Sequence, residues 1–223
     1  MFREPLILSL KLALITTLVL VLIGIPLAYF LSRSKSRTKP FIESIISLPL
    51  VLPPTVLGFY FLMAFGRNSG LGAWLDDTLG LSLVFSFEGL VIASVIYSLP
   101  FMVHPVQAGF RNLPASLREA AQLMGHSDWS IFHRILVPNI KSSLITGIVL
   151  SFAHTIGEFG VVLMIGGNIP GLTEVASIAI YKEVETMNYA TANQYSLILL
   201  LFSFAILFLV YAFNRKSEKV YWQ

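Results

Sequence analysis

Residues 115–138 read ASLREAAQLMGHSDWSIFHRILVP, the longest polar interval of the chain whose pattern still predicts ordered helix. Apolar segments long enough to cross a bilayer lie on both sides of it. Ser116 followed by Glu119 matches a capping box, in which the serine oxygen and the glutamate carboxylate accept the first free amides of a helix. The pattern therefore predicts a short helix that starts at Ser116.

A second helix is predicted in the same stretch. Gly125 is suited to the left-handed residue that ends a helix, and Ser127 or Asp128 can cap the helix that follows. Pro138 then breaks the pattern. We expect a helix, a glycine turn and a second helix at a membrane surface.

The composition indicates an integral membrane protein. Of the 223 residues, 56% are hydrophobic and 12% are charged. A hydrocarbon layer of about 30 Å requires about 20 apolar residues in a helix. The chain therefore has an expected all-α fold with five transmembrane helices, or six if the amphipathic outer segment 173–189 also crosses. The five apolar intervals are 12–31, 44–66, 89–110, 142–157 continuing past Glu158 to 166, and 187–214.

The basic residues are sorted by loop. Eleven of the 15 Lys and Arg lie on alternate connections, which the positive-inside rule places in the cytoplasm, so the N-terminus is expected outside and the C-terminus inside. They do not form one patch with interleaved aromatics, and no nucleic-acid partner is expected. The eleven are Arg33, Lys35, Arg37, Lys39, Arg111, Arg118, Arg134, Lys141, Arg215, Lys216 and Lys219.

Several classes of site are missing from the sequence. Cysteine is absent, which excludes disulfides and thiolate metal sites. The chain contains neither G-x-x-x-x-G-K-[ST], nor G-x-S-x-G, nor His-x-x-x-His. We therefore expect no catalytic residue, bound cofactor or metal site, and a chain that is not itself an enzyme.

A spaced motif in the opening stretch resembles that of a known family. Glu119-Ala120-Ala121, three residues, Gly125, nine residues and Ile135-Leu136-Val137-Pro138 resemble the EAA motif of type I ABC importer permeases, with Val137 where that pattern has leucine. The resemblance implies a type I permease fold, in which residues 115–138 form a cytoplasmic coupling loop that docks on an ATPase subunit. The alternative is an ordinary amphipathic connector. The residues that would couple to the ATPase are Glu119, Ala120, Ala121, Gly125, Ile135 and Pro138.

Three further stretches resemble molybdate permeases, and less specifically sulfate permeases: LPLVLPP at 48–54 followed by Gly58, GEFG at 157–160, and GGNIPG at 166–171. The resemblance implies one ABC transmembrane domain over residues 1–223 in a bacterial inner membrane. It also implies a homodimer, two cytoplasmic ATPase subunits that bind ATP-Mg, and a periplasmic or extracellular oxyanion-binding protein. The expected cargo is molybdate, or tungstate. Sulfate or thiosulfate remains an alternative.

The second apolar interval contains the first candidates for a translocation pathway. Pro49, Pro53 and Pro54 cannot all lie inside one regular helix. Irregular backbone at membrane depth survives where it is buried in protein or lines a cavity. The alternative is a simple helix start with prolines in its first turn. The candidate pathway or gate residues are Ser47, Pro53, Pro54, Thr55, Ser151 and Thr155.

Three polar side chains are candidates for burial within the bundle. Glu158 is embedded deep in an apolar segment, between Gly157 and Gly160, which would let another helix approach. An acid on the path would repel an anionic cargo, so we expect Glu158 to be hydrogen-bonded off that path. His104 is expected to be structural rather than a substrate or proton site. A self-sufficient ion-coupled carrier that uses Glu158 and His154, four residues apart on one helical face, remains the rival function.

Overall fold

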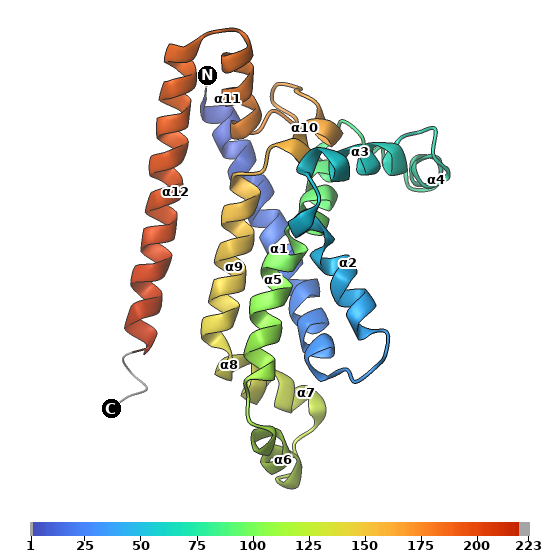
Figure 1. Ribbon diagram of the computed structural model, residues 1–223, viewed down its shortest axis with the longest axis vertical. Coiled ribbons are helices and arrows are strands. Elements are labelled where there is room, and N and C mark those ends of the chain that lie inside the picture. The colour runs from blue at the N-terminus through green and yellow to red at the C-terminus, as the bar shows by residue number, and fades with distance from the viewer. Residues whose placement is uncertain (1, 219–223) are drawn as a thin grey trace.

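The computed structural model describes residues 2–218, which form helices and loops and contain no β-strand (Figure 1). In chain order the elements are α1 (Arg3–Arg33), α2 (Lys39–Val51), α3 (Pro54–Phe65), α4 (Gly70–Leu79), α5 (Phe87–Arg111), α6 (Ala115–Leu123), α7 (Asp128–Ile131), the π-helical turn η1 (Phe132–Leu136), α8 (Val137–Asn139), α9 (Lys141–Ile156), α10 (Gly160–Gly166), α11 (Ala176–Glu185) and α12 (Tyr189–Glu218).

The centre of the bundle consists of α1, α5 and α9, each of which packs along the other two. Glycines bring these helices close together. A methyl group added at Gly24 would lie 2.7 Å from the Met102 Cγ, and one at Gly147 would lie 3.1 Å from the Met102 sulfur. The three helices therefore meet around Met102, which is fully buried.

The predicted membrane spans are confirmed in part. Among the described residues, α1, α5 and residues 189–208 of α12 are each long and apolar enough to cross a membrane, and the total is up to five if each of two bent helix pairs counts as one span. The predicted continuation of the fourth span to residue 166 is wrong. α9 ends at Ile156, and α10 turns away to pack against α3 and α5. The amphipathic segment becomes α11, whose 10 residues extend only about 15 Å and pack against α1 and α12.

The second span is broken at its prolines, as predicted. α2 ends at Val51 and α3 begins at Pro54, and the two helices are bent by 114°. Pro53 between them has extended backbone, with φ −55° and ψ 138°. Because Pro54 starts a new helix, its missing amide removes no helical hydrogen bond.

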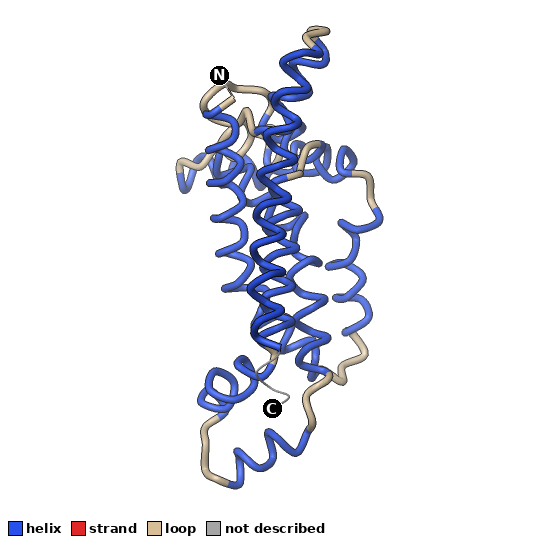
Figure 2. The backbone as a smooth tube through the Cα atoms, turned by 90° about the vertical axis from the view of Figure 1, so that its left-hand side faces the viewer, coloured by secondary structure: helices blue, strands red, loops and turns tan. Residues whose placement is uncertain are grey.

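The α6–α7 segment projects beyond one end of the bundle, and α12 runs toward that same end (Figures 1 and 2). α1 begins at the opposite end (Figure 1). Of the basic residues on which the predicted topology rests, Lys219 lies outside the described residues. α12 stands at the side of the bundle, with only 6% of its apolar window buried, as expected of a lipid-facing helix.

Candidate functional site

The first helix of the projecting segment begins one residue earlier than the sequence predicts. α6 starts at Ala115, after Pro114, whose backbone is extended with φ −59° and ψ 134°. Ser116 already lies inside the first turn, and no side chain caps the helix. The predicted capping box of Ser116 and Glu119 is therefore wrong, because Pro114 takes the capping position.

The predicted glycine turn is confirmed. Gly125 has φ +79°, its amide donates to the Gln122 carbonyl at 2.9 Å, and the His126 amide donates to the Ala121 carbonyl at 3.2 Å. This pair of bonds is the Schellman motif, which requires a left-handed residue at the position of Gly125. Ser127 then caps α7, because its hydroxyl accepts from the Ser130 amide at 3.3 Å.

The second half of the segment differs from the prediction at its end. α7 continues through the wide turn η1 into α8, so Pro138 lies within the helical run rather than ending it. The chain bends by 77° between α8 and α9, where Ile140 leaves helical geometry with ψ 21°. The π-helical turn shifts the backbone pairing just before Pro138, where the proline offers no amide of its own.

The motif residues fall on two sides of this segment. Ala121 is 1% exposed and belongs to the same buried cluster as Ile131, Leu136 and Ile140. Glu119 and Ala120 are exposed. At the tip, Leu123 is 90% exposed and Met124 is 69% exposed. Exposed apolar side chains next to a rigid turn are typical of a protein interface. Of the remaining motif residues, Gly125 and Pro138 are also exposed and Ile135 is half-buried.

An ion pair braces the segment across the turn. Arg118 of α6 donates to the Asp128 carboxylate of α7 at 2.7 Å. This hydrogen bond, together with the guanidinium charge, lowers the pKa of the Asp128 carboxyl below its ordinary value. The ion pair therefore links α6 to α7 across the turn.

A polar cluster joins α2 to α5. Ser47 donates to the Glu43 carbonyl at 2.7 Å, and its oxygen lies 3.1 Å from Nε2 of His104. Because the serine proton is already used, the histidine Nε2–H is the donor in that second bond. The Glu43 carboxylate accepts from Gln107 at 2.7 Å and from Arg111 at 2.5 Å. His104 is therefore hydrogen-bonded to α2, and its structural role stays a prediction.

The sequence analysis missed Glu43 and Gln107 in this cluster. The available signal was the spacing of His104, Gln107 and Arg111, which places all three on one face of α5. Together with Pro40, Ser44 and Ser47 these residues line a cavity of about 470 Å³. Ser47 is thus one wall of a polar cavity.

A second cavity of about 480 Å³ lies at the break between α2 and α3, and it brings together Pro54 and Thr55 with His154 and Glu158. Gly160 allows this approach, because a methyl group there would lie 2.8 Å from the Pro54 Cβ. Gly157 has only its own helix within 4 Å, so the predicted close contact holds for Gly160 alone. The remaining wall residues are Tyr97, Ala153, Gly157, Phe159 and Gly160.

Glu158 differs from the prediction in two ways. It is 4% exposed, and neither of its carboxylate oxygens makes a hydrogen bond of standard geometry to a side chain that the structure describes, although the Ser94 hydroxyl lies nearby. It also does not share a helical face with His154, because α9 ends two residues before it. Its backbone carbonyl is held by Ser177 of the α11 helix, which donates at 2.6 Å.

Ser151 and Thr155 turn into the helix packing and do not line this cavity. Thr155 donates to the Ser151 carbonyl at 2.9 Å. Ser98 of α5, which the sequence analysis missed, lies 2.9 Å from Nδ1 of His154 and 3.1 Å from the Thr155 hydroxyl. These bonds tie α5 to α9. The side chains that the structure describes include no cluster of three or more His, Asp or Glu that could hold a metal ion.

Curated relatives resemble this chain over most of its length. It is 46% identical over 209 residues to the molybdenum transport system permease protein ModB of Azotobacter vinelandii, covering 93% of this chain and 92% of that protein. It is 34% identical to the putative molybdenum transport system permease protein YvgM of Bacillus subtilis (strain 168), covering 94% and 92%. A probable sulfate transport system permease protein cysT of Chlorella vulgaris is 31% identical, covering 96% and 80%.

Solved structures share the fold. A bacterial ABC transporter involved in the import of the acidic polysaccharide alginate matches with a TM-score of 0.74 at 18% identity, covering 94% of this chain and 79% of that chain. The family model of the binding-protein-dependent transport system inner membrane component matches residues 20–219. This chain therefore belongs to the family of inner membrane components of binding-protein-dependent transport systems.

Proposed function

We propose that this chain is the membrane-spanning subunit of an ATP-driven importer that carries molybdate across the inner membrane. The observation that supports it most is the 46% identity to a molybdenum permease over nearly the full length of both proteins. This chain translocates the cargo and does not itself catalyse a reaction. ATP-Mg binds to a separate ATPase subunit, and an external binding protein delivers the oxyanion.

The geometry of the α6–α7 segment supports a coupling role. Its exposed tip, with Leu123 and Met124, is free to dock on a cytoplasmic partner. Its inner side is continuous with the bundle, because Ala121, Ile131 and Leu136 belong to one buried cluster with Leu31 of α1 and Phe110 of α5. A displacement of the tip is thereby passed to the membrane helices, since a close-packed core transmits strain.

The path for the anion is proposed to lie between two copies of the chain. A single bundle of this size is small to enclose a pathway, and a two-fold dimer is the most common solution. The broken span at Pro53 and Pro54, with Thr55 on the adjacent cavity, supplies the irregular backbone that a pathway can accommodate. The coupling end, to which α12 runs, faces the cytoplasm, and the N-terminus faces outside.

Sulfate is the second candidate cargo, because a sulfate permease is 31% identical over most of this chain. Molybdate, tungstate and sulfate are all tetrahedral dianions, so shape and charge do not identify the cargo. Competition during transport is the measurement that distinguishes them. We expect a tenfold excess of tungstate to inhibit uptake of labelled molybdate, and the same excess of sulfate to leave it nearly unchanged.

Reversing the charge of Glu119 is expected to release the ATPase subunit. Glu119→Arg alters the exposed face of α6 without touching the buried Ala121, so the chain should still insert and fold. We expect at least a tenfold loss of co-purified ATPase, which corresponds to about 1.4 kcal/mol of interface energy. Affinity purification from membranes, followed by quantification of both subunits, measures it.

Asp77→Arg is the matched control, because it makes the same charge change at an exposed site on α4, away from the coupling segment. We expect this variant to retain the ATPase subunit. Normal association of Glu119→Arg would contradict the coupling role.

Transport by the Glu158→Gln variant distinguishes an ATP-driven importer from a self-sufficient carrier. The amide has nearly the same volume, and removing the carboxylate leaves no charged partner behind, because Glu158 forms no ion pair among the side chains that the structure describes. We expect ATP-driven uptake to stay within about twofold of the original, the range of small effects seen for volume-conserving changes. A carrier that depends on this carboxyl would instead lose transport. Uptake in vesicles with and without ATP measures both outcomes.

A further inference from the structure

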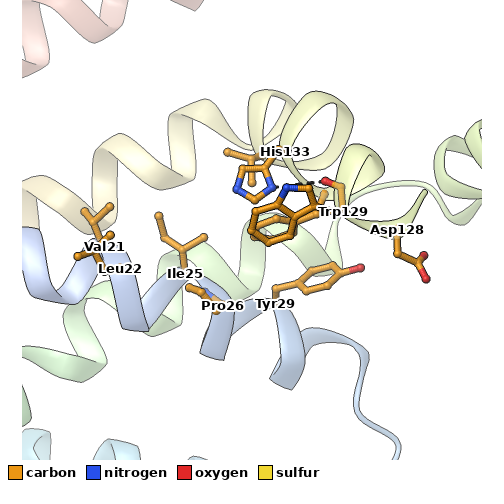
Figure 3. A pocket seen from close by; sticks show the side chains of 10 residues that line it. Val21, Leu22, Ile25, Pro26, Tyr29, Asp128, Trp129 and His133 are labelled. Carbon is orange, nitrogen blue, oxygen red and sulfur yellow. Dashed lines mark hydrogen bonds between the residues drawn. The ribbon is translucent and has the colours of Figure 1, made fainter. Parts of the chain in front are cut away.

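An apolar groove of about 610 Å³ runs between α1 and the α7–α8 segment, and none of the motif residues assigned above to the ATPase contact lines it. On α1 it is lined by Val21, Leu22, Ile25, Pro26 and Tyr29; on the other side it is lined by Asp128, Trp129, Phe132, His133 and Val137. Its volume lies within the range of about 300–1,000 Å³ that is typical of small-molecule sites. Figure 3 shows Trp129 and His133 opposite Ile25, Pro26 and Tyr29.

On the proposed membrane orientation, the groove extends from the apolar part of α1 to its cytoplasmic end. Val21 and Tyr29 are eight residues apart on α1, a distance of about 12 Å along the helix axis. Val21 to Pro26 lie within the apolar part of the span, whereas Tyr29 and Trp129 are of the residue type that settles at the interface. An elongated ligand with an apolar chain and a polar head fits this gradient.

Basic residues follow Tyr29, the last α1 residue of the groove lining. Arg33, one turn beyond Tyr29, donates to the Tyr29 hydroxyl at 2.9 Å, and its guanidinium lies 5.6 Å from the tyrosine ring centre. Lys35 and Arg37 follow it, and none of these three cations has an ion-pair partner among the side chains that the structure describes. The one acid in the lining, Asp128, is already paired with Arg118 at 2.7 Å. A negatively charged head would therefore meet an uncompensated cation.

We propose that this groove binds an anionic phospholipid of the cytoplasmic leaflet, with one acyl chain along Leu22 and Ile25 and the phosphate at Arg33. A guanidinium is well suited to the phosphate oxygens. The ligand would bridge α1 to the segment that carries the coupling turn. The leaflet assignment rests on the proposed membrane orientation, while the experiment below measures lipid binding and requires no transport.

Two other occupants fit less well. A soluble partner cannot reach Val21 to Pro26, which lie at hydrocarbon depth. A second copy of the chain packed here about a two-fold axis would bring its own Arg33, Lys35 and Arg37 toward the same cations, and like charges repel. An anionic lipid is the occupant that matches both the depth and the charge.

Quenching of Trp129 fluorescence tests the proposal directly. The chain has three tryptophans, so replacing Trp74 and Trp222 with phenylalanine leaves Trp129, which is 73% exposed at the groove, as the reporter. The full chain in neutral detergent is titrated with phosphatidylglycerol or phosphatidylcholine that carries brominated acyl chains. We expect saturable quenching, with half-saturation at an about tenfold lower fraction of phosphatidylglycerol, as one charge-assisted contact provides.

Matched variants test the phosphate contact and the acyl-chain contact of the site separately. Arg33→Gln should raise the half-saturating phosphatidylglycerol fraction about tenfold, whereas Arg37→Gln, which removes the same charge without contact to Tyr29, should change it less than twofold. Leu22→Gln should weaken binding of both lipids about fivefold, and Leu18→Gln, on the exposed face of α1 but outside the groove, should not.

Two results would overturn the proposal. One is quenching that is equal for both lipids and insensitive to Arg33→Gln. The other is efficient disulfide formation between two copies that carry Leu22→Cys in this cysteine-free chain, which would show that a second copy covers the groove.

Discussion

Replacing Gly125 with proline is expected to abolish ATP-driven uptake while the protein still inserts in the membrane. Gly125 has φ +79°, which proline cannot adopt, and its amide donates to the Gln122 carbonyl at 2.9 Å, a bond that proline cannot make. The local cost is about 3 kcal/mol or more. Because the exposed Leu123 and Met124 are presented by this turn, we expect at least a hundredfold loss of uptake of labelled molybdate in vesicles with the ATPase subunit and ATP.

Gly125→Asn is the matched control, since asparagine adopts left-handed backbone more readily than other side chains and retains the amide. No neighbouring atom lies within 4 Å of a methyl group at this position, so the side chain has room. We expect this variant to keep at least half of the uptake. Normal transport by the proline variant would show that the turn does not couple.

The Gly160→Val variant is expected to have the second largest effect. A methyl group at Gly160 already lies 2.8 Å from the Pro54 Cβ and 3.4 Å from the Thr55 amide nitrogen, so the larger side chain must push the start of α3 away from α10. Overpacking of this kind costs about 1–3 kcal/mol. We expect uptake to fall at least tenfold, because the displaced residues form the break in the second span and one wall of the adjacent cavity.

Gly157→Ala is the control for Gly160→Val, because the two glycines lie only three positions apart. Gly157 has φ −87°, and the nearest atoms to an added methyl group are carbonyl oxygens of its own helix at 3.7 and 3.8 Å, which is ordinary contact. Uptake should stay within about twofold of the original. Equal losses in the two variants would argue against a specific role for the contact between Gly160 and Pro54.

Local backbone chemistry allowed much of the α6–α7 segment and the break in the second span to be predicted from the sequence. Gly125 and Ser127 act at the positions where their conformational and capping preferences place them, and the second span breaks because Pro54 disfavours helical backbone at Pro53. Ser116 did not act as predicted because Pro114, two residues earlier, sets the helix start. The sequence pattern alone does not show which of two nearby helix-start residues, here a proline and a serine, sets the first residue of the helix.

Contacts between distant segments could not be predicted from the sequence pattern. The bonds from Gln107 and Arg111 to Glu43 join residues more than 60 positions apart, and the unpaired state of Glu158 depends on what α5, α9 and α10 bring around it. The end of α9 at Ile156 was missed because the apolar run continues to residue 166, while the helix does not. The composition shows how long an apolar run is, whereas the packing of the helices determines where the chain bends within that run.

Uptake of labelled molybdate tests the proposed function most directly. Vesicles that contain this chain, with and without a co-expressed ATPase subunit, are supplied with internal ATP, an external binding protein and excess sulfate as competitor. We expect uptake to require both the ATPase subunit and ATP and to resist sulfate. Uptake by this chain alone, without ATP, would contradict the importer and move Glu158 and His154 to the centre of the mechanism.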